Sequence, residues 1–143
     1  MFNSVLVVCV GNICRSPVGE RLLQNQLPNL KIASAGIGAL VGHAADSTMT
    51  EVAAAHGLQL EGHVAQQFTA KIGHNFDLVL AMEPGHKRDI VRVAPQLTGR
   101  TMLFDQWTGA TGISDPYRHK RDVHEQVFQE ISAAAKSWAK RLQ

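Results

Sequence analysis

Short apolar runs alternate along the chain with segments of helical periodicity. The first run, from Val5 to Val8, is β-branched and shows no polar alternation, so it predicts a strand buried on both faces. Three later apolar runs predict strands over 30–35, 76–81 and 101–104. A strand that is buried on both faces is typical of a parallel sheet covered by helices.

The segments between these runs carry helix signals. Ser16 and Pro17 offer an N-cap followed by proline at the first helical position, and apolar residues then continue to about residue 27. Further helices are predicted over 46–56, where Gly57 ends the pattern, over 83–93, and from 122 to the end of the chain. The alternation predicts an α/β fold, a single-domain four-stranded parallel sheet with helices on both faces and a phosphate-binding loop after the first strand.

The composition fits one domain that occupies residues 1–143. The chain is 45% hydrophobic and 18% charged, and its net charge of +2 comes from scattered basic residues, which argues against nucleic acid as the main partner. Its two cysteines, Cys9 and Cys14, lie in one short segment, which excludes a disulfide framework and favours a reducing compartment. No export leader or long apolar span is present, so we expect a cytoplasmic protein without membrane insertion. We also expect a monomer.

The segment from Cys9 to Pro17 combines the groups that a phosphate site needs. Cys9 ends the first predicted strand, and Arg15 follows six residues later at the start of a helix. A loop of this length can turn successive backbone N–H groups inward at the positive end of the helix, where they bind a tetrahedral oxyanion. The same charges favour a thiolate, so Cys9 is predicted to be a nucleophile. The other predicted loop residues are Val10, Gly11, Asn12, Ile13, Cys14 and Ser16.

Individual side chains of this loop have specific candidate roles. The planar fork of Arg15 can hold two phosphoryl oxygens at once, and the Ser16 hydroxyl can either cap the helix or donate to the thiolate. Gly11 lets the loop turn, and Asn12 tolerates a left-handed backbone. Cys14 alone is more typical of a small buried hydrophobic residue. No metal or cofactor is expected, because the chain lacks a second cysteine pair and its seven histidines show no ligand spacing.

A second motif, Asp115-Pro116-Tyr117, lies in an irregular segment before the last predicted helix. Taken alone, an Asp-Pro pair most commonly begins a turn. Together with a thiolate loop, Asp115 becomes the candidate general acid, because a phosphate ester leaves as an alkoxide or phenolate that needs a proton.

The two motifs together resemble those of the low-molecular-weight protein tyrosine phosphatases, whose Cys-x5-Arg-Ser signature near the N-terminus is followed by Asp-Pro-Tyr before the last helix. The resemblance covers the whole chain. It implies that Cys9 attacks phosphorus, that Arg15 holds the phosphoryl group, and that Asp115 protonates the leaving phenolate and later activates water. It also implies a bell-shaped pH profile with an acidic optimum.

The resemblance extends to residues around the loop. The residues that match a supporting hydrogen-bond network in the family are Asn12, Ser34 and His63. Leu40 and Tyr117 are candidate walls of a cleft deep enough to favour phosphotyrosine over phosphoserine. The family also implies a reversible disulfide between Cys9 and Cys14 under peroxide.

The resemblance is closer to the bacterial Wzb-like branch, which is associated with capsule and exopolysaccharide export. Segments 1–3, 39–42, 102–104 and 115–118 carry this likeness. The branch dephosphorylates the tyrosine-rich tail of a membrane-bound autokinase, which implies a tail of this kind as the partner. Three departures bear on substrate preference: Gln66 replaces a common arginine, one tyrosine follows Pro116 where eukaryotic members have two, and the region around Leu40 lacks their large aromatic wall.

Two other functions use similar residues. A thiol-dependent arsenate reductase has the same loop but needs further cysteines in the middle of the chain, and none follows Cys14. A non-catalytic phosphotyrosine-binding module is expected to lose Cys9, Arg15 or Asp115, whereas all three are present. A nucleotide-binding loop is disfavoured because the Gly-Lys-Ser/Thr step is missing.

Overall fold

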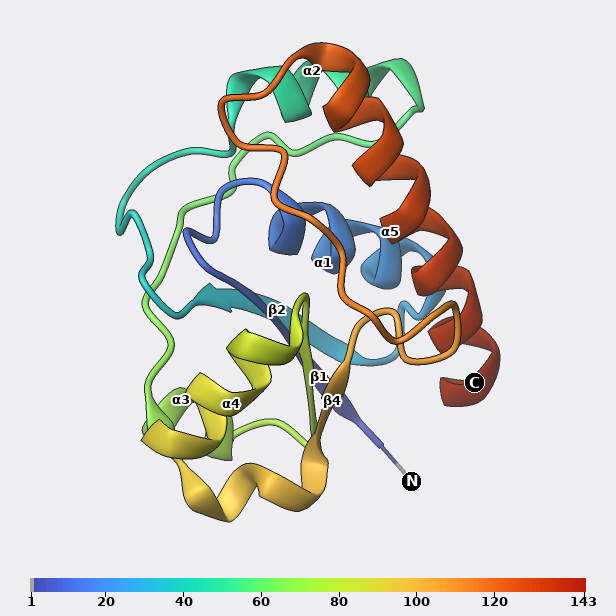
Figure 1. The fold of residues 1–143 in the computed structure, drawn as a ribbon. Helices are drawn as coiled ribbons and strands as arrows, with labels where there is room; N and C mark the ends of the chain where they lie inside the picture. The colour runs from blue at the N-terminus through green and yellow to red at the C-terminus, as the bar shows by residue number, and fades with distance from the viewer. Residues whose placement is uncertain (1) are drawn as a thin grey trace.

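A computed structural model describes residues 2–143 and contains a four-stranded parallel sheet with the strand order β2-β1-β3-β4 (Figure 1). The strands are β1 (Ser4–Cys9), β2 (Lys31–Gly36), β3 (Leu78–Ala81) and β4 (Thr101–Leu103). The central strand β1 pairs with β2 from Ser4 opposite Lys31 to Cys9 opposite Gly36, and it pairs with β3 on its other side. The sheet confirms the predicted α/β fold.

Helices cover both faces of this sheet. They are α1 (Arg15–Gln26), α2 (Ser47–Ala55), α3 (Ala70–His74), α4 (Pro84–Val93), a 3-10 helix (Pro95–Arg100) and α5 (Arg121–Leu142). Figure 1 shows α1 and α5 together on one side of the sheet and α3 and α4 on the other. Within residues 2–143, no helix combines the length and the apolar character that crossing a bilayer requires.

Two hydrophobic clusters form on the two faces of β1. Val5 and Val7 belong to the cluster packed under α1, α2 and α5, whereas Leu6 and Val8 belong to the cluster packed under α4. All four side chains are fully buried. The continuous apolar run therefore reflects burial on both faces, which fixes the position of Cys9 at the end of the central strand.

Some element boundaries differ from the predicted ones. Helix α1 begins at Arg15 with Cys14 as its N-cap residue, so Ser16 lies inside the first turn and does not cap the helix. The short helix α3 was not predicted, because five residues carry no clear periodicity; the Thr69 side chain caps it by accepting a hydrogen bond from the Ile72 amide at 3.2 Å. The 3-10 helix was also missed, and it begins at Pro95 immediately after α4.

Candidate active site

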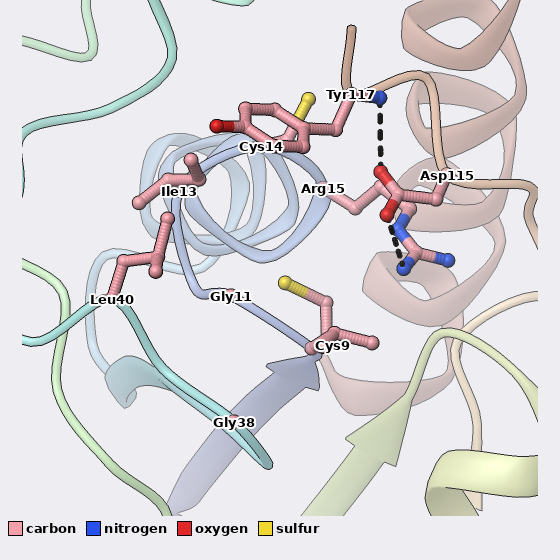
Figure 2. Close-up of a pocket in the computed structure, with 10 residues that line it drawn as sticks. Cys9, Gly11, Ile13, Cys14, Arg15, Gly38, Leu40, Asp115 and Tyr117 are labelled. Atoms are coloured by element: carbon pink, nitrogen blue, oxygen red, sulfur yellow. Dashed lines mark hydrogen bonds and ion pairs between the residues drawn. The ribbon is translucent and has the colours of Figure 1, made fainter.

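The loop between β1 and α1 forms the floor of a cavity of about 180 Å³ (Figure 2). The loop lies outside the carboxyl end of the sheet, where open α/β sheets usually bind ligands. Cys9 is almost completely buried at 2% exposure, and Asp115 and Tyr117 reach the cavity from the segment before α5. The lining residues are Cys9, Val10, Gly11, Ile13, Cys14, Arg15, Gly38, Leu40, Asp115 and Tyr117.

The carbonyl groups of the loop all point away from its interior. Those of Cys9, Val10 and Gly11 accept hydrogen bonds from the backbone amides of residues 37, 38 and 40 at 2.9–3.0 Å. The Asn12 carbonyl accepts from His63 Nε2 at 2.5 Å, and the Ile13 carbonyl accepts from the amide of residue 46 at 2.7 Å. In a trans peptide the N–H group points opposite to the C=O group, so the amides that follow these carbonyls turn inward. This arrangement forms an anion-binding nest at the N-terminus of α1.

Asn12 connects the loop to three neighbouring segments. It is fully buried and adopts a left-handed backbone with φ of 57°, whereas Gly11 does not. Its Nδ2 donates to Ser16 Oγ at 2.8 Å and to Ser34 Oγ at 2.9 Å, and its Oδ1 accepts from the Gln66 amide at 2.9 Å. The Ser16 hydroxyl lies 2.9 Å from Cys9 Sγ. Because Ser16 Oγ already accepts from Asn12, its proton is free to be donated to the thiolate.

Ser34 and His63 lie beside Asn12, as the family resemblance implies. Ser34 Oγ also donates to Glu20 Oε1, and the Gln66 side chain donates to the Ser34 carbonyl at 2.9 Å. From the sequence, Gln66 is only a departure from the family pattern, and no local signal indicates a role for Glu20. Both residues support the network, through contacts that sequence spacing does not reveal.

The phosphate loop passes so close to Gly36 that no side chain fits there. A Cβ atom on Gly36 would lie 2.3 Å from the Val10 carbonyl oxygen and 3.0 Å from the Asn12 nitrogen. Since both are backbone atoms, the loop itself would have to move.

Gly36→Ala is therefore expected to lower kcat on an aryl phosphate about 100-fold, because small displacements of catalytic groups are costly. Steady-state kinetics measure this effect. Gly38→Ala is the matched control, since a Cβ on Gly38 meets only Val10 Cγ1, at 3.9 Å. Equal activities for the two variants would contradict this account of Gly36.

Two hydrogen-bond acceptors fix the position of the Arg15 guanidinium group. Its Nη1 donates to Glu83 Oε2 and to the Ile113 carbonyl, the latter at 2.7 Å, and its side chain is 1% exposed. Glu83 was predicted only as a helix start, because its ion pair with Arg15 depends on the tertiary fold. Burial and the positive charge of Arg15 lower the pKa of His86, whose Nε2 lies 3.6 Å from the same Glu83 oxygen.

Asp115 lies directly above Arg15 (Figure 2). Its Oδ1 accepts a hydrogen bond from the Tyr117 amide at 3.0 Å, and its Oδ2 is 3.7 Å from Arg15 Nη2. The side chain is 45% exposed, so it can reach an incoming ester. Leu40 and Tyr117 are 38% and 37% exposed and border the cavity mouth.

The two cysteines of the loop differ in their surroundings. Burial and the carboxylate of Asp46 raise the pKa of the Cys14 thiol far above its usual value, so Cys14 is a neutral thiol. Figure 2 shows its sulfur turned away from that of Cys9. Cys9 instead lies beside the Ser16 hydroxyl, and it lines the same cavity as Arg15.

This arrangement can bind a phosphate monoester and transfer its phosphoryl group. Amides turned inward and Arg15 can compensate the charge of a phosphoryl group, a thiol such as Cys9 at the cavity floor can attack phosphorus, and a carboxyl group such as Asp115 at the mouth can protonate a leaving oxygen.

Known proteins match almost the entire chain in sequence and in fold. Residues 4–143 match the family model described as low molecular weight phosphotyrosine protein phosphatase. The phosphatase Etp of Escherichia coli K12 is 52% identical over 141 residues, which cover 99% of this chain and 95% of Etp. The crystal structure of the tyrosine phosphatase Wzb from Escherichia coli K30 with sulphate is 48% identical, covers 100% of both chains and superposes with a TM-score of 0.98.

A second solved structure contains an aromatic ligand. Wzb of Vibrio vulnificus in complex with benzylphosphonate is 47% identical, covers 99% of both chains and has a TM-score of 0.96. The family match over nearly all residues, the identities near one half and the shared fold agree. The chain belongs to the low molecular weight phosphotyrosine protein phosphatase family.

Proposed function

We propose that residues 1–143 form one phosphatase domain that hydrolyses phosphotyrosine in proteins through a cysteinyl-phosphate intermediate on Cys9. The observation that carries this proposal is the convergence of Cys9, Arg15 and Asp115 on one cavity, with the loop amides turned inward. Membership of the phosphotyrosine phosphatase family supports it.

The reaction proceeds in two steps. In the first, the Cys9 thiolate attacks phosphorus in line, the bond from phosphorus to the tyrosine oxygen breaks, and Asp115 gives its proton to that oxygen. In the second, water attacks the phosphocysteine, and the Asp115 carboxylate takes the proton of the water. Inorganic phosphate leaves and the Cys9 thiolate is restored. Arg15 and the loop amides hold the phosphoryl oxygens throughout.

The cavity walls favour an aromatic ester. Cys9 lies at the floor, and the apolar side chains of Ile13, Leu40 and Tyr117 line the way to it. A tyrosine ring is long enough to carry its phosphate to the floor and apolar enough to contact these walls, whereas phosphoserine is short and lacks a ring. The relative from Vibrio vulnificus holds benzylphosphonate, which likewise joins a ring to a phosphoryl group.

Hydrolysis of matched phosphopeptides tests the proposal. We expect kcat/KM for a phosphotyrosine peptide to exceed that for the matched phosphoserine peptide at least about 100-fold, the discrimination that a shaped pocket provides. Preference for phosphoserine or phosphoarginine would contradict the proposed substrate. Thioredoxin-dependent reduction of arsenate without phosphatase activity would favour the reductase alternative, and peptide binding without phosphate release would favour a non-catalytic module.

We propose further that the substrate is the tyrosine-rich tail of a membrane-bound autokinase that controls capsule or exopolysaccharide production, and that the enzyme acts as a cytoplasmic monomer. The likeness to the tyrosine phosphatases Wzb and Etp supports a phosphotyrosine protein as the substrate. The exposed basic residues Arg118, Lys120 and Arg121 follow the cavity wall, and the Arg118 guanidinium lies over the Tyr117 ring at 5.3 Å from its centroid. These positive charges suit a tail that carries several phosphates.

A further inference from the structure

Three potential metal ligands, one of them in the phosphate loop, lie close together. Cys14 is the N-cap residue of α1, Asp46 is the N-cap residue of α2, and His124 lies in the first turn of α5. One sulfur, one carboxylate oxygen and one ring nitrogen from these residues lie within 4.8 Å of one another. Cys14 and His124 are buried, and the Asp46 side chain is 14% exposed, which leaves a path from solvent.

His124 directs an unpartnered nitrogen at this point. Its Nδ1 lies 3.1 Å from the Lys120 carbonyl, and because a carbonyl only accepts, Nδ1 carries a proton. Its Nε2 is buried, has no hydrogen-bond partner among residues 2–143, and lies 3.3 Å from Asp46 Oδ2. Because Nδ1 already donates to a carbonyl, the pair formed by Nε2 and this carboxylate oxygen is satisfied either by a second proton on the ring or by a cation bound between the two atoms.

We propose that Cys14, Asp46 and His124 bind a thiophilic divalent cation of the Zn²⁺ class, with water in the fourth position. Thiolate sulfur, imidazole nitrogen and carboxylate oxygen are the ligands that Zn²⁺ takes in proteins. A zinc ion held by three protein side chains, with water in the fourth position of a tetrahedron, is a common type of zinc site. Supporting hydrogen bonds are already present: His124 Nδ1 donates to the Lys120 carbonyl, and the Met49 amide donates to Asp46 Oδ2 at 3.0 Å.

Binding is a proton-for-metal exchange at Cys14. A bond forms between the cation and Sγ, and the thiol proton leaves to water, so the bound site contains one thiolate, one carboxylate and one dication. No electrons are transferred. The cation then connects the phosphate loop to α2 and to α5, and a ligand that binds only the folded chain stabilises it.

Ligand spacing along the sequence does not predict this metal site. These three residues belong to separate segments, which the fold brings together around the start of α1. Since Cys9 is a second thiol that Zn²⁺ can bind, the test must remove it. All proteins in the experiment therefore carry Cys9→Ser.

Calorimetric titration of the metal-free full chain with Zn²⁺ tests the site. We expect one Zn²⁺ per Cys9→Ser chain and a higher melting temperature in its presence. A second substitution in this chain, His124→Gln, is expected to weaken Zn²⁺ binding at least about 10-fold. Added Asp46→Asn should weaken it similarly, while its amide oxygen still caps α2. Added His56→Gln is the matched control, because His56 forms an exposed pair with Glu125 on the same two helices, and it is expected to leave Zn²⁺ affinity unchanged.

A second measurement does not depend on stability. Co²⁺ bound to the Cys9→Ser chain is expected to show the near-ultraviolet absorption of a cobalt–thiolate bond, and added Cys14→Ser is expected to abolish it. Absence of Zn²⁺ binding to the folded Cys9→Ser chain would overturn the proposal. So would Zn²⁺ affinity that is unchanged in both folded His124→Gln and folded Asp46→Asn, or Co²⁺ absorption that persists without Cys14.

Discussion

Cys9→Ser is expected to lower turnover of an aryl phosphate at least about 10,000-fold, the scale of loss when a covalent nucleophile is removed. The amides turned into the loop, the Ser16 hydroxyl and Arg15 stabilise an anion at this position. A thiol can supply that anion near neutral pH, whereas a serine hydroxyl cannot. The binding groups for the phosphoryl oxygens remain, so the variant should still bind substrate.

Initial rates with p-nitrophenyl phosphate measure this loss, and Cys14→Ser is the matched control within the same loop. Its sulfur points away from Cys9 (Figure 2), so its replacement is expected to cost far less activity than replacement of Cys9. The nucleophile assignment fails if Cys9→Ser retains more activity than Cys14→Ser.

The same Cys9→Ser protein also tests the proposed partner. Because it binds the phosphoryl group without forming a phosphocysteine, it is expected to hold a phosphorylated autokinase tail in a stable complex, which free phosphate or vanadate displaces. Analytical gel filtration detects the complex. A parent enzyme that hydrolyses phosphotyrosine peptides but neither dephosphorylates nor binds the tail would contradict the kinase partner and leave the proposed chemistry intact.

The central strand and the closing helix could be predicted from sequence because their signals are local. The run from Val5 to Val8 is buried on both faces of the sheet, and the helical spacing from residue 122 onward matches α5. The start of α1 could not be located in the same way. Ser16 has the chemistry of an N-cap residue, but its hydroxyl is engaged by contacts with Cys9 and Asn12, and the helix begins at Arg15, two residues before the start that this cap predicts.

The residues that position the catalytic groups depend on contacts between distant segments. Glu83 and the Ile113 carbonyl hold Arg15 from positions 68 and 98 residues away. Nothing in the local sequence around either position indicates a role in phosphate binding. A helix-start signal at Glu83 was visible, but the direction of its side chain follows from the packing of α4 beside the sheet.

Asp115→Asn is expected to lower kcat on a phosphotyrosine peptide about 100- to 1,000-fold, which is the contribution of a positioned general acid. Asparagine preserves the size of the side chain and can still accept the Tyr117 amide hydrogen bond, so the segment above Arg15 should keep its shape. The asparagine side chain, however, has no proton acidic enough to be given to the leaving phenolate.

The nature of the leaving group separates loss of the acid from a general disturbance of the cavity. The p-nitrophenolate ion leaves readily without protonation, so hydrolysis of p-nitrophenyl phosphate should fall much less in Asp115→Asn than hydrolysis of phenyl phosphate. The alkaline side of the bell-shaped pH profile should also flatten, because it reports deprotonation of the acid. Equal losses with both esters and an unchanged pH profile would assign Asp115 to positioning Arg15, through the 3.7 Å contact between them, and not to proton transfer.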